Sequence, residues 1–171
     1  AEGIAVEGIS LASRYLPRAV TDGSDIEART QMLVCSSMGA TAFQKGLGAM
    51  HALAHPLGAL YDAHHGTLNA ILMPYVLKAN RSVIEEKITR LTRYLGLTHT
   101  GFDGFLDWVV DLRGQLGIPD TLAKININDN DNDSEIIGKM AVADPSAGGN
   151  PIRFSSEDYQ RIFLDAVAGH L

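Results

Sequence analysis

The sequence has little cysteine: Cys35 is the only one among 171 residues. A single cysteine cannot form an internal disulfide, so a small disulfide-stapled secreted scaffold is excluded and a reducing, cytoplasmic location is expected. No apolar run approaches the 18 or so residues of a membrane-spanning helix. The first residues also lack the charged segment and cleavage site of a secretory signal. We therefore expect a cytoplasmic protein that has no membrane partner.

The sequence also lacks strand patterning and a basic surface. Strict alternation of apolar and polar residues, which is typical of half-buried strands, does not extend over any length. The 14 Lys and Arg form no stripe and the net charge is −6, so no nucleic-acid partner is expected. What is present, 46% hydrophobic and 20% charged residues, is typical of a folded globular protein of one domain.

Apolar residues recur at helical spacing along most of the chain. Two prolines should interrupt this pattern, because Pro17 favours a helix end and Pro74 a kink or a break. The small residues in the second half of the second segment suggest close backbone approach within the core. The predicted helices cover residues 2–16, a segment from Ser24 or Asp25 to Phe43, 67–79, 81–95, 102–116, 135–142, and a segment after Ser155 or Ser156. The sequence thus predicts one all-α bundle domain over residues 1–171.

The densest group of reactive side chains is a histidine cluster, because four of the six histidines lie within fifteen positions of a small, apolar stretch. These four are His51, His55, His64 and His65. His51 and His55 are four residues apart, so they share one face if they lie on a helix. A neutral imidazole binds divalent metals well and also exchanges protons near neutral pH. The cluster therefore indicates a metal site or a proton-handling site.

His51 and His65 can share a metal only if the chain turns between them. Their separation of fourteen residues equals about 21 Å of rise on one straight helix. Each ligating nitrogen must lie about 2.1 Å from the metal. The residues that favour a turn here are Pro56, Gly58, Asp62 and Gly66. We expect His51 in the middle of one helix, with His64 or His65 at the start of the next.

Two other interpretations of the cluster stay open. In one, the histidines are hydrogen-bonded residues of a non-catalytic helical module whose role is assembly. In the other, the chain belongs to a metal hydrolase, for which Asp62 is the only nearby carboxylate. A zinc-protease helix is excluded, because the Glu that must follow its first His is Ala52 here.

The block from Ala42 to Pro74 resembles the signature of the iron-containing (group III) alcohol dehydrogenases. In that family Gly-x-x-His-x-x-x-His leads into His-Gly-x-x-Asn-Ala and then a Pro. The matching stretches here are Gly48-Ala-Met-His51-Ala-Leu-Ala-His55, His65-Gly66-Thr-Leu-Asn69-Ala and Pro74. The segment from Asp144 to Phe154, with Asn150, Pro151 and Arg153, is similar to the family's final loop. The helical order resembles the C-terminal α domain of this dehydroquinate synthase-like fold.

The resemblance implies roles for three histidines. His51 and His65 match two metal ligands, and His55 matches a catalytic, cofactor-binding histidine beside the nicotinamide, where it helps bind cofactor or relays a proton. The implied cofactors are Fe²⁺, Zn²⁺ or another divalent metal, and NAD or NADP. The implied partners are a small alcohol or aldehyde substrate and, for the full-length protein, a second copy in a homodimer. His64 matches no role.

Two parts of the family pattern have no counterpart in the sequence. The family's preceding Rossmann-like domain carries a Gly-rich phosphate-binding turn, and Gly46-Leu47-Gly48 follows no strand, so it is not that turn. The family's first two metal ligands, an Asp and a His four residues on, also lie before the point that matches Ala1. We expect the chain to be the C-terminal domain of a longer enzyme that binds NAD(P) mainly through its other domain. Alone it should be inactive.

Overall fold

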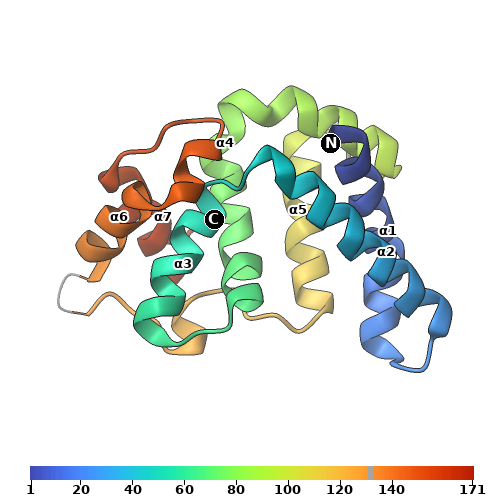
Figure 1. Cartoon of the computed structure of the whole chain (residues 1–171), viewed down its shortest axis with the longest axis horizontal. Coiled ribbons are helices and arrows are strands. Elements are labelled where there is room, and N and C mark those ends of the chain that lie inside the picture. Colours follow the sequence, from blue (N-terminus) through green and yellow to red (C-terminus); the bar gives the residue numbers. More distant parts are fainter. Residues whose placement is uncertain (131–132) are drawn as a thin grey trace. The chain divides into compact units, whose positions relative to one another are not determined.

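The computed structural model describes residues 1–130 and 133–171, which contain helices and no strand (Figure 1). The α-helices of these residues are α1 (Glu2–Thr21), α2 (Ile26–Ala42), α3 (Ala49–Tyr61), α4 (His65–Leu95), α5 (Gly101–Gln115), α6 (Asp133–Ala143) and α7 (Ser156–Ala168). Short 3₁₀ turns are η1 (Phe43–Lys45), η2 (Ala123–Ile125) and η3 (Pro145–Gly149). The predicted all-α class is confirmed.

The chain divides into two compact units, Ala1–Gly46 and Leu47–Leu171. In the first, α1 packs against α2 (Figure 1). The Cys35 thiol donates to the Gly8 carbonyl at 3.2 Å, so the small residues do permit close backbone approach. The prediction that this part of α2 lies in a core is wrong, however. Ala28 is the only buried residue of α2, and Leu33 is 71% exposed.

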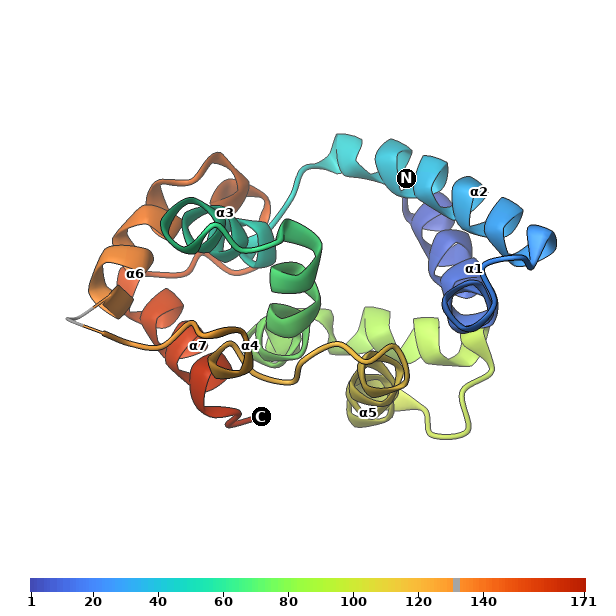
Figure 2. The same ribbon diagram turned by 90° about the horizontal axis from the view of Figure 1, so that it is seen from below.

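The second unit has a continuous hydrophobic core built by α3, α4, α6 and α7 (Figure 2). Helix α3 is apolar on nearly all sides, which is the pattern of a buried helix. Small alanines on α3 let the neighbouring helices approach it closely. The largest fully buried apolar side chains of this core are Leu53, Leu57, Leu68, Ile71, Leu72, Leu122, Ile127, Ile137, Tyr159 and Phe163. This core holds α3 rigidly against the start of α4.

Both interrupting prolines lie inside helices. Pro17 is within α1, which continues to Thr21, so the predicted helix end is wrong. Ion pairs from Arg18 to Asp25 and Glu27, at 2.8 and 2.7 Å, tie this last turn to the start of α2. Pro74 is within α4, a single helix that covers both segments predicted as separate helices, 67–79 and 81–95. The axis of α4 changes direction along its length in Figures 1 and 2, in keeping with a kink rather than a break.

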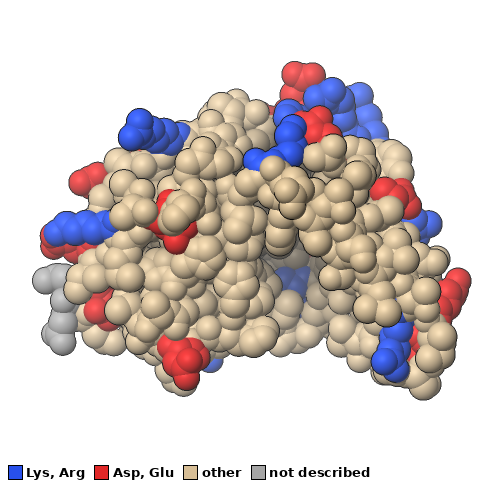
Figure 3. Space-filling model, viewed as in Figure 1, with Lys and Arg blue, Asp and Glu red and all other residues tan. Residues whose placement is uncertain are grey.

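None of the described helices combines the length and the apolar character needed to cross a membrane. Acidic and basic side chains are interspersed on the face shown in Figure 3, and no basic stripe runs across it. That face agrees with the scatter of Lys and Arg along the sequence.

Candidate functional site

The histidine cluster is placed by the first two turns of α3 and the first turn of α4. Helix α3 begins after Gly48, which offers no capping side chain, and the free N–H of Ala49 donates instead to Asn150 Oδ1 at 3.2 Å. The amide of Asn150 also pairs reciprocally with that of buried Asn80, at 2.9 and 3.1 Å. Three segments far apart in sequence are thereby joined where α3 starts. His51, the third residue of α3, is fixed at this junction.

A three-residue turn, Asp62 to His64, connects α3 to α4. Asp62 ends α3 in the left-handed conformation (φ 51°, ψ 33°) that Asp and Asn tolerate best among residues with a Cβ. His64 is the N-cap of α4, and its Nδ1 accepts from the Thr67 N–H at 3.3 Å. His65 is therefore the first residue of α4. Pro56 and Gly58, two of the predicted turn residues, lie inside α3 instead.

The turn brings three imidazoles together. The ring centroids of His51 and His65 are 5.2 Å apart, those of His55 and His65 5.5 Å, and those of His51 and His55 5.9 Å. His51 is buried in the first turn of α3, rather than in the middle of a helix, whereas the His55 side chain is 41% exposed. The three rings therefore span the distance from the core to the surface.

The polar side chains of Asp144 and Asn69 contact the cluster. The carboxylate of Asp144 lies 2.9 Å from His55 Nδ1 through its Oδ2. The amide Nδ2 of Asn69, one turn along α4, lies 2.9 Å from His65 Nε2. Asn69 Oδ1 is buried and has no hydrogen-bond partner among the described residues. A buried acceptor without a partner is costly in a folded protein and often marks a functional site.

The pKa of His51 is lowered from its ordinary value. Burial is the largest cause, because it disfavours the charged ring, and the neighbouring His65 and His55 lower the pKa further. The carboxylate of Asp144 opposes this shift. His51 is consequently neutral at pH 7, which is the form that can donate a lone pair to a metal.

The structure thus groups His51, His55 and His65, and it gives His64 and Asp62 structural positions at the helix ends. Asp144 and Asn69 were missed as site residues. Asp144 is 89 residues from His55, and its place in the loop similar to the family's final loop was the only available signal. Asn69 was part of the quoted motif. Within residues 1–130 and 133–171, no group of three or more His, Cys, Asp or Glu side chains is arranged to hold a metal ion.

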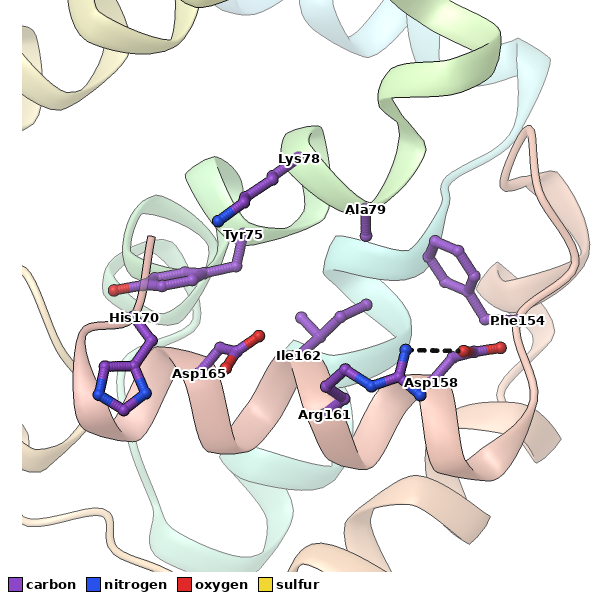
Figure 4. Close-up of a pocket in the computed structure, with 9 residues that line it drawn as sticks. All are labelled: Tyr75, Lys78, Ala79, Phe154, Asp158, Arg161, Ile162, Asp165 and His170. Carbon is purple, nitrogen blue, oxygen red and sulfur yellow. Dashed lines mark hydrogen bonds and ion pairs between the residues drawn. The ribbon is translucent and has the colours of Figure 1, made fainter.

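A separate hollow of about 210 Å³ lies between α4 and α7 (Figure 4). Tyr75 and Lys78 line it from α4, and Arg161 and Asp165 line it from α7. Arg161 donates to Asp158 at its rim, at 3.4 Å. None of the three clustered histidines lines this hollow.

Comparison with known sequences identifies the fold. The sequence model for the C-terminal part of the Fe-containing alcohol dehydrogenase family matches residues 1–167. The chain belongs to the iron-containing alcohol dehydrogenase family. It is 39% identical to the 4-hydroxybutyrate dehydrogenase of Cupriavidus necator over 98% of its length, and 28% identical to the NAD-dependent methanol dehydrogenase of Bacillus methanolicus over 97%.

A solved member of the family has the same fold. The crystal structure of a 1,3-propanediol oxidoreductase superposes with a TM-score of 0.90, at 31% identity over 96% of this chain. The chain spans less than half the length of these family members: 45% of both dehydrogenases and 44% of the oxidoreductase. The expected similarity to the family's C-terminal α domain is confirmed.

Proposed function

We propose that the full-length protein is an NAD(P)-dependent, divalent-metal alcohol dehydrogenase. In this proposal the chain contributes two metal ligands, one proton-handling histidine and a wall of the substrate site. The observation that carries it is the convergence of His51, His55 and His65, with ring centroids 5.2 to 5.9 Å apart, in a chain matched to the family over residues 1–167.

The separation of His51 and His65 supports their assignment as the metal pair. Two imidazoles whose nitrogens lie about 2.1 Å from one ion have ring centroids roughly 4.6 to 5.3 Å apart for angles of about 90° to 109° at the ion. The observed 5.2 Å for His51 and His65 falls in this range, whereas both separations from His55 exceed it. Two ligands are fewer than the four of a closed zinc site. The rest come from a part of the full-length protein outside these 171 residues.

The chemistry divides between the bound groups and the side chains of this chain. The metal, when bound, is a Lewis acid that polarises the oxygen of the alcohol or carbonyl substrate, and NAD(P) accepts or supplies the hydride. His51 and His65 would hold the ion, His51 from a buried position and His65 from an exposed one. His55, one helical turn from His51 and open to the surface, takes the hydroxyl proton during oxidation and returns one during reduction.

The names of the relatives support a substrate class and a nicotinamide cofactor. Their names specify 4-hydroxybutyrate, 1,3-propanediol and methanol, so we propose a small alcohol or its carbonyl partner as substrate. One of these relatives is NAD-dependent by name, and the proposal covers NAD and NADP because their recognition belongs mainly to the other domain. We also propose a homodimer in the cytoplasm.

Metal content of the full-length protein tests the ligand assignment. His51→Ala and His65→Ala should each weaken metal affinity by more than about 100-fold, since loss of a ligand exceeds the 10- to 100-fold effect of losing a partner outside the ligand set. The measurement is elemental analysis after dialysis against limiting metal. His64→Asn is the matched control, because Asn retains the N-cap of α4, and it should keep wild-type metal content. Wild-type occupancy in both alanine variants would favour the non-catalytic module instead.

The isolated 171-residue chain tests whether these residues need the rest of the full-length protein for metal binding and catalysis. We expect it to oxidise no alcohol with NAD or NADP, and to bind Fe²⁺ or Zn²⁺ weakly, because it supplies only two of the ligands. Spectrophotometric assay of the purified chain and metal titration check this. Cofactor-dependent turnover by the chain alone would show that these residues hold a complete site.

A further inference from the structure

The contact between His55 and Asp144 has a geometry that can hold the orientation of the His55 imidazole, beyond balancing its charge. His55 Nδ1 lies 2.9 Å from Asp144 Oδ2, and the exposed fractions of the two side chains are 41% and 12%. The carboxylate is therefore more buried than the ring that it contacts, and the contact engages Nδ1 and not Nε2. A charge pair that served surface solubility alone would have both partners in water.

Asp144 is itself held in place by two further sets of contacts. Its Oδ1 accepts from the Ser146 N–H at 2.7 Å and so caps η3. The η3 turn packs closely against Leu47, which lies just before α3. A Cβ at Gly149 would lie only 1.9 Å from the Leu47 carbonyl oxygen. Only a glycine allows this contact. The carboxylate is thus positioned against the helix that carries His55.

The hydrogen-bonding capacity of the carboxylate determines which His55 nitrogen carries the proton. Burial alone would raise the pKa of Asp144, but the hydrogen bonds from Ser146 and His55 outweigh it and the pKa is lowered, so the group is ionised at neutral pH. An ionised carboxylate only accepts hydrogen bonds, so Nδ1 of His55 must donate. Neutral His55 then carries its lone pair on Nε2.

We propose that Asp144 is the positioning residue of His55, holding its ring orientation and its Nδ1–H tautomer so that Nε2 is the nitrogen that exchanges the substrate proton. The assignment of a substrate proton to His55 rests on the proposed function. The tautomer assignment rests on the contacts of Asp144 alone. Carboxylate-to-imidazole pairs of this kind set the tautomer in other proton-transfer sites.

Asp144→Asn is the sharpest variant, because one amide atom can replace each carboxylate oxygen. The amide oxygen can keep the Ser146 N–H, which leaves the NH₂ group facing His55. Nδ1 must then accept, and the neutral ring changes to the Nε2–H tautomer. We expect long-range ¹H–¹⁵N NMR spectra of the 171-residue chain, at alkaline pH where imidazoles are neutral, to show this change. Asp111→Asn, an exposed acid on α5, should leave the His55 signals unchanged.

Steady-state kinetics of the full-length protein provide the second test of the Asp144 proposal. Asp144→Asn should lower kcat by about 10- to 100-fold, with KM for the alcohol and metal content within about twofold of wild type. Combined with His55→Ala, it should cause no further loss, because both changes remove one function. Asp111→Asn should retain wild-type kcat.

The outcomes separate the two proposals. An unchanged His55 tautomer in Asp144→Asn, or kinetic losses that multiply in the double variant, would overturn the positioning role. No alcohol oxidation by the full-length protein, or wild-type kcat in His55→Ala, would instead overturn the proposed function. The tautomer measurement needs neither metal nor turnover, so it decides the role of Asp144 in that case as well.

Discussion

Two buried tyrosines of the second unit differ in what their hydroxyl groups contact. Tyr75 Oη donates to the Asp120 carbonyl at 3.2 Å, whereas Tyr159 Oη is buried without a hydrogen-bond partner among the described residues. Burial raises the pKa of Tyr159 to about 12, with the nearby charge of Asp144 adding to the shift. A hydroxyl removed from water without a partner costs free energy, whereas a satisfied one contributes a little.

Replacing each tyrosine with phenylalanine should therefore change stability in opposite directions. We expect Tyr159→Phe to raise the free energy of unfolding by about 1 kcal/mol, because it removes the penalty of an unpaired group. Tyr75→Phe should lower it by about 1 kcal/mol, because the Asp120 carbonyl loses its donor. Urea unfolding followed by circular dichroism measures both. Equal destabilisation by the two changes would show that the Tyr159 hydroxyl has a partner.

At the residue scale, the sequence predicted the histidines of the site. It did not predict Asp144, the carboxylate that contacts His55. His51, His55 and His65 are close in sequence, and the need for a turn followed from helix rise alone. The turn residue that proved decisive, Asp62, is of a type that tolerates the left-handed conformation. Asp144 contacts His55 from 89 positions away, and no local pattern indicates which of many acidic residues will arrive there.

At the level of helices, α6 and α7 approach closely at Gly138. A Cβ on this residue would lie 2.6 Å from the Ser156 carbonyl and 2.8 Å from Gln160 Cγ. The backbone at the start of α7 cannot give way easily, since Ser155 and Asp158 form a capping box there. The contact therefore sets the distance between two helices of the core.

Gly138→Ala should lower the free energy of unfolding by about 1 to 3 kcal/mol, the usual cost of overpacking. Gly114→Ala is the matched control, because Gly114 is also helical and a Cβ there would meet nothing within 4 Å. That change should be neutral or stabilising by up to about 1 kcal/mol, as Ala favours the helix. Thermal melts of both variants provide the comparison. A Gly138→Ala protein as stable as Gly114→Ala would mean that α7 shifts freely.

The existence of the helices was predictable from the periodicity of apolar residues. The continuation of α1 past Pro17 and of α4 past Pro74 was not. A proline removes one backbone hydrogen bond and strains one turn, at a cost of about 3 kcal/mol. Around Pro74 that cost is offset by burial of Leu72, Tyr75 and Val76 against the core. At Pro17 the ion pairs of Arg18 maintain the last turn. Both compensations involve residues from other segments, so a local pattern does not contain them.

At the level of the whole molecule, the two units differ in how much they bury. In α1 and α2 the buried residues are Gly8, Leu11 and Ala28, all among the described residues. Helix α3 alone buries seven, His51 among them. Buried apolar contacts govern resistance to local opening, so the two units should open with different free energies.

Hydrogen exchange of the 171-residue chain should reveal this difference. We expect amides of α3 and of the first half of α4 to exchange slowest, and those of α1 and α2 to exchange at least about 100-fold faster, because fewer buried contacts oppose their opening. Mass spectrometry of peptides from each helix gives the rates. Equal protection of α2 and α3 would contradict the expectation.

The sequence separations around the site have a consequence for its assembly during translation. His51, His55 and His65 leave the ribosome within fifteen residues of one another, whereas Asp144 follows His55 by 89 residues and Asn150 follows Ala49 by 101. At about 5 to 20 residues per second, the carboxylate is synthesised roughly 5 to 20 s after the ring that it contacts. The imidazoles can gather while the chain is still growing, but His55 acquires its partner only after a further 89 residues have been synthesised.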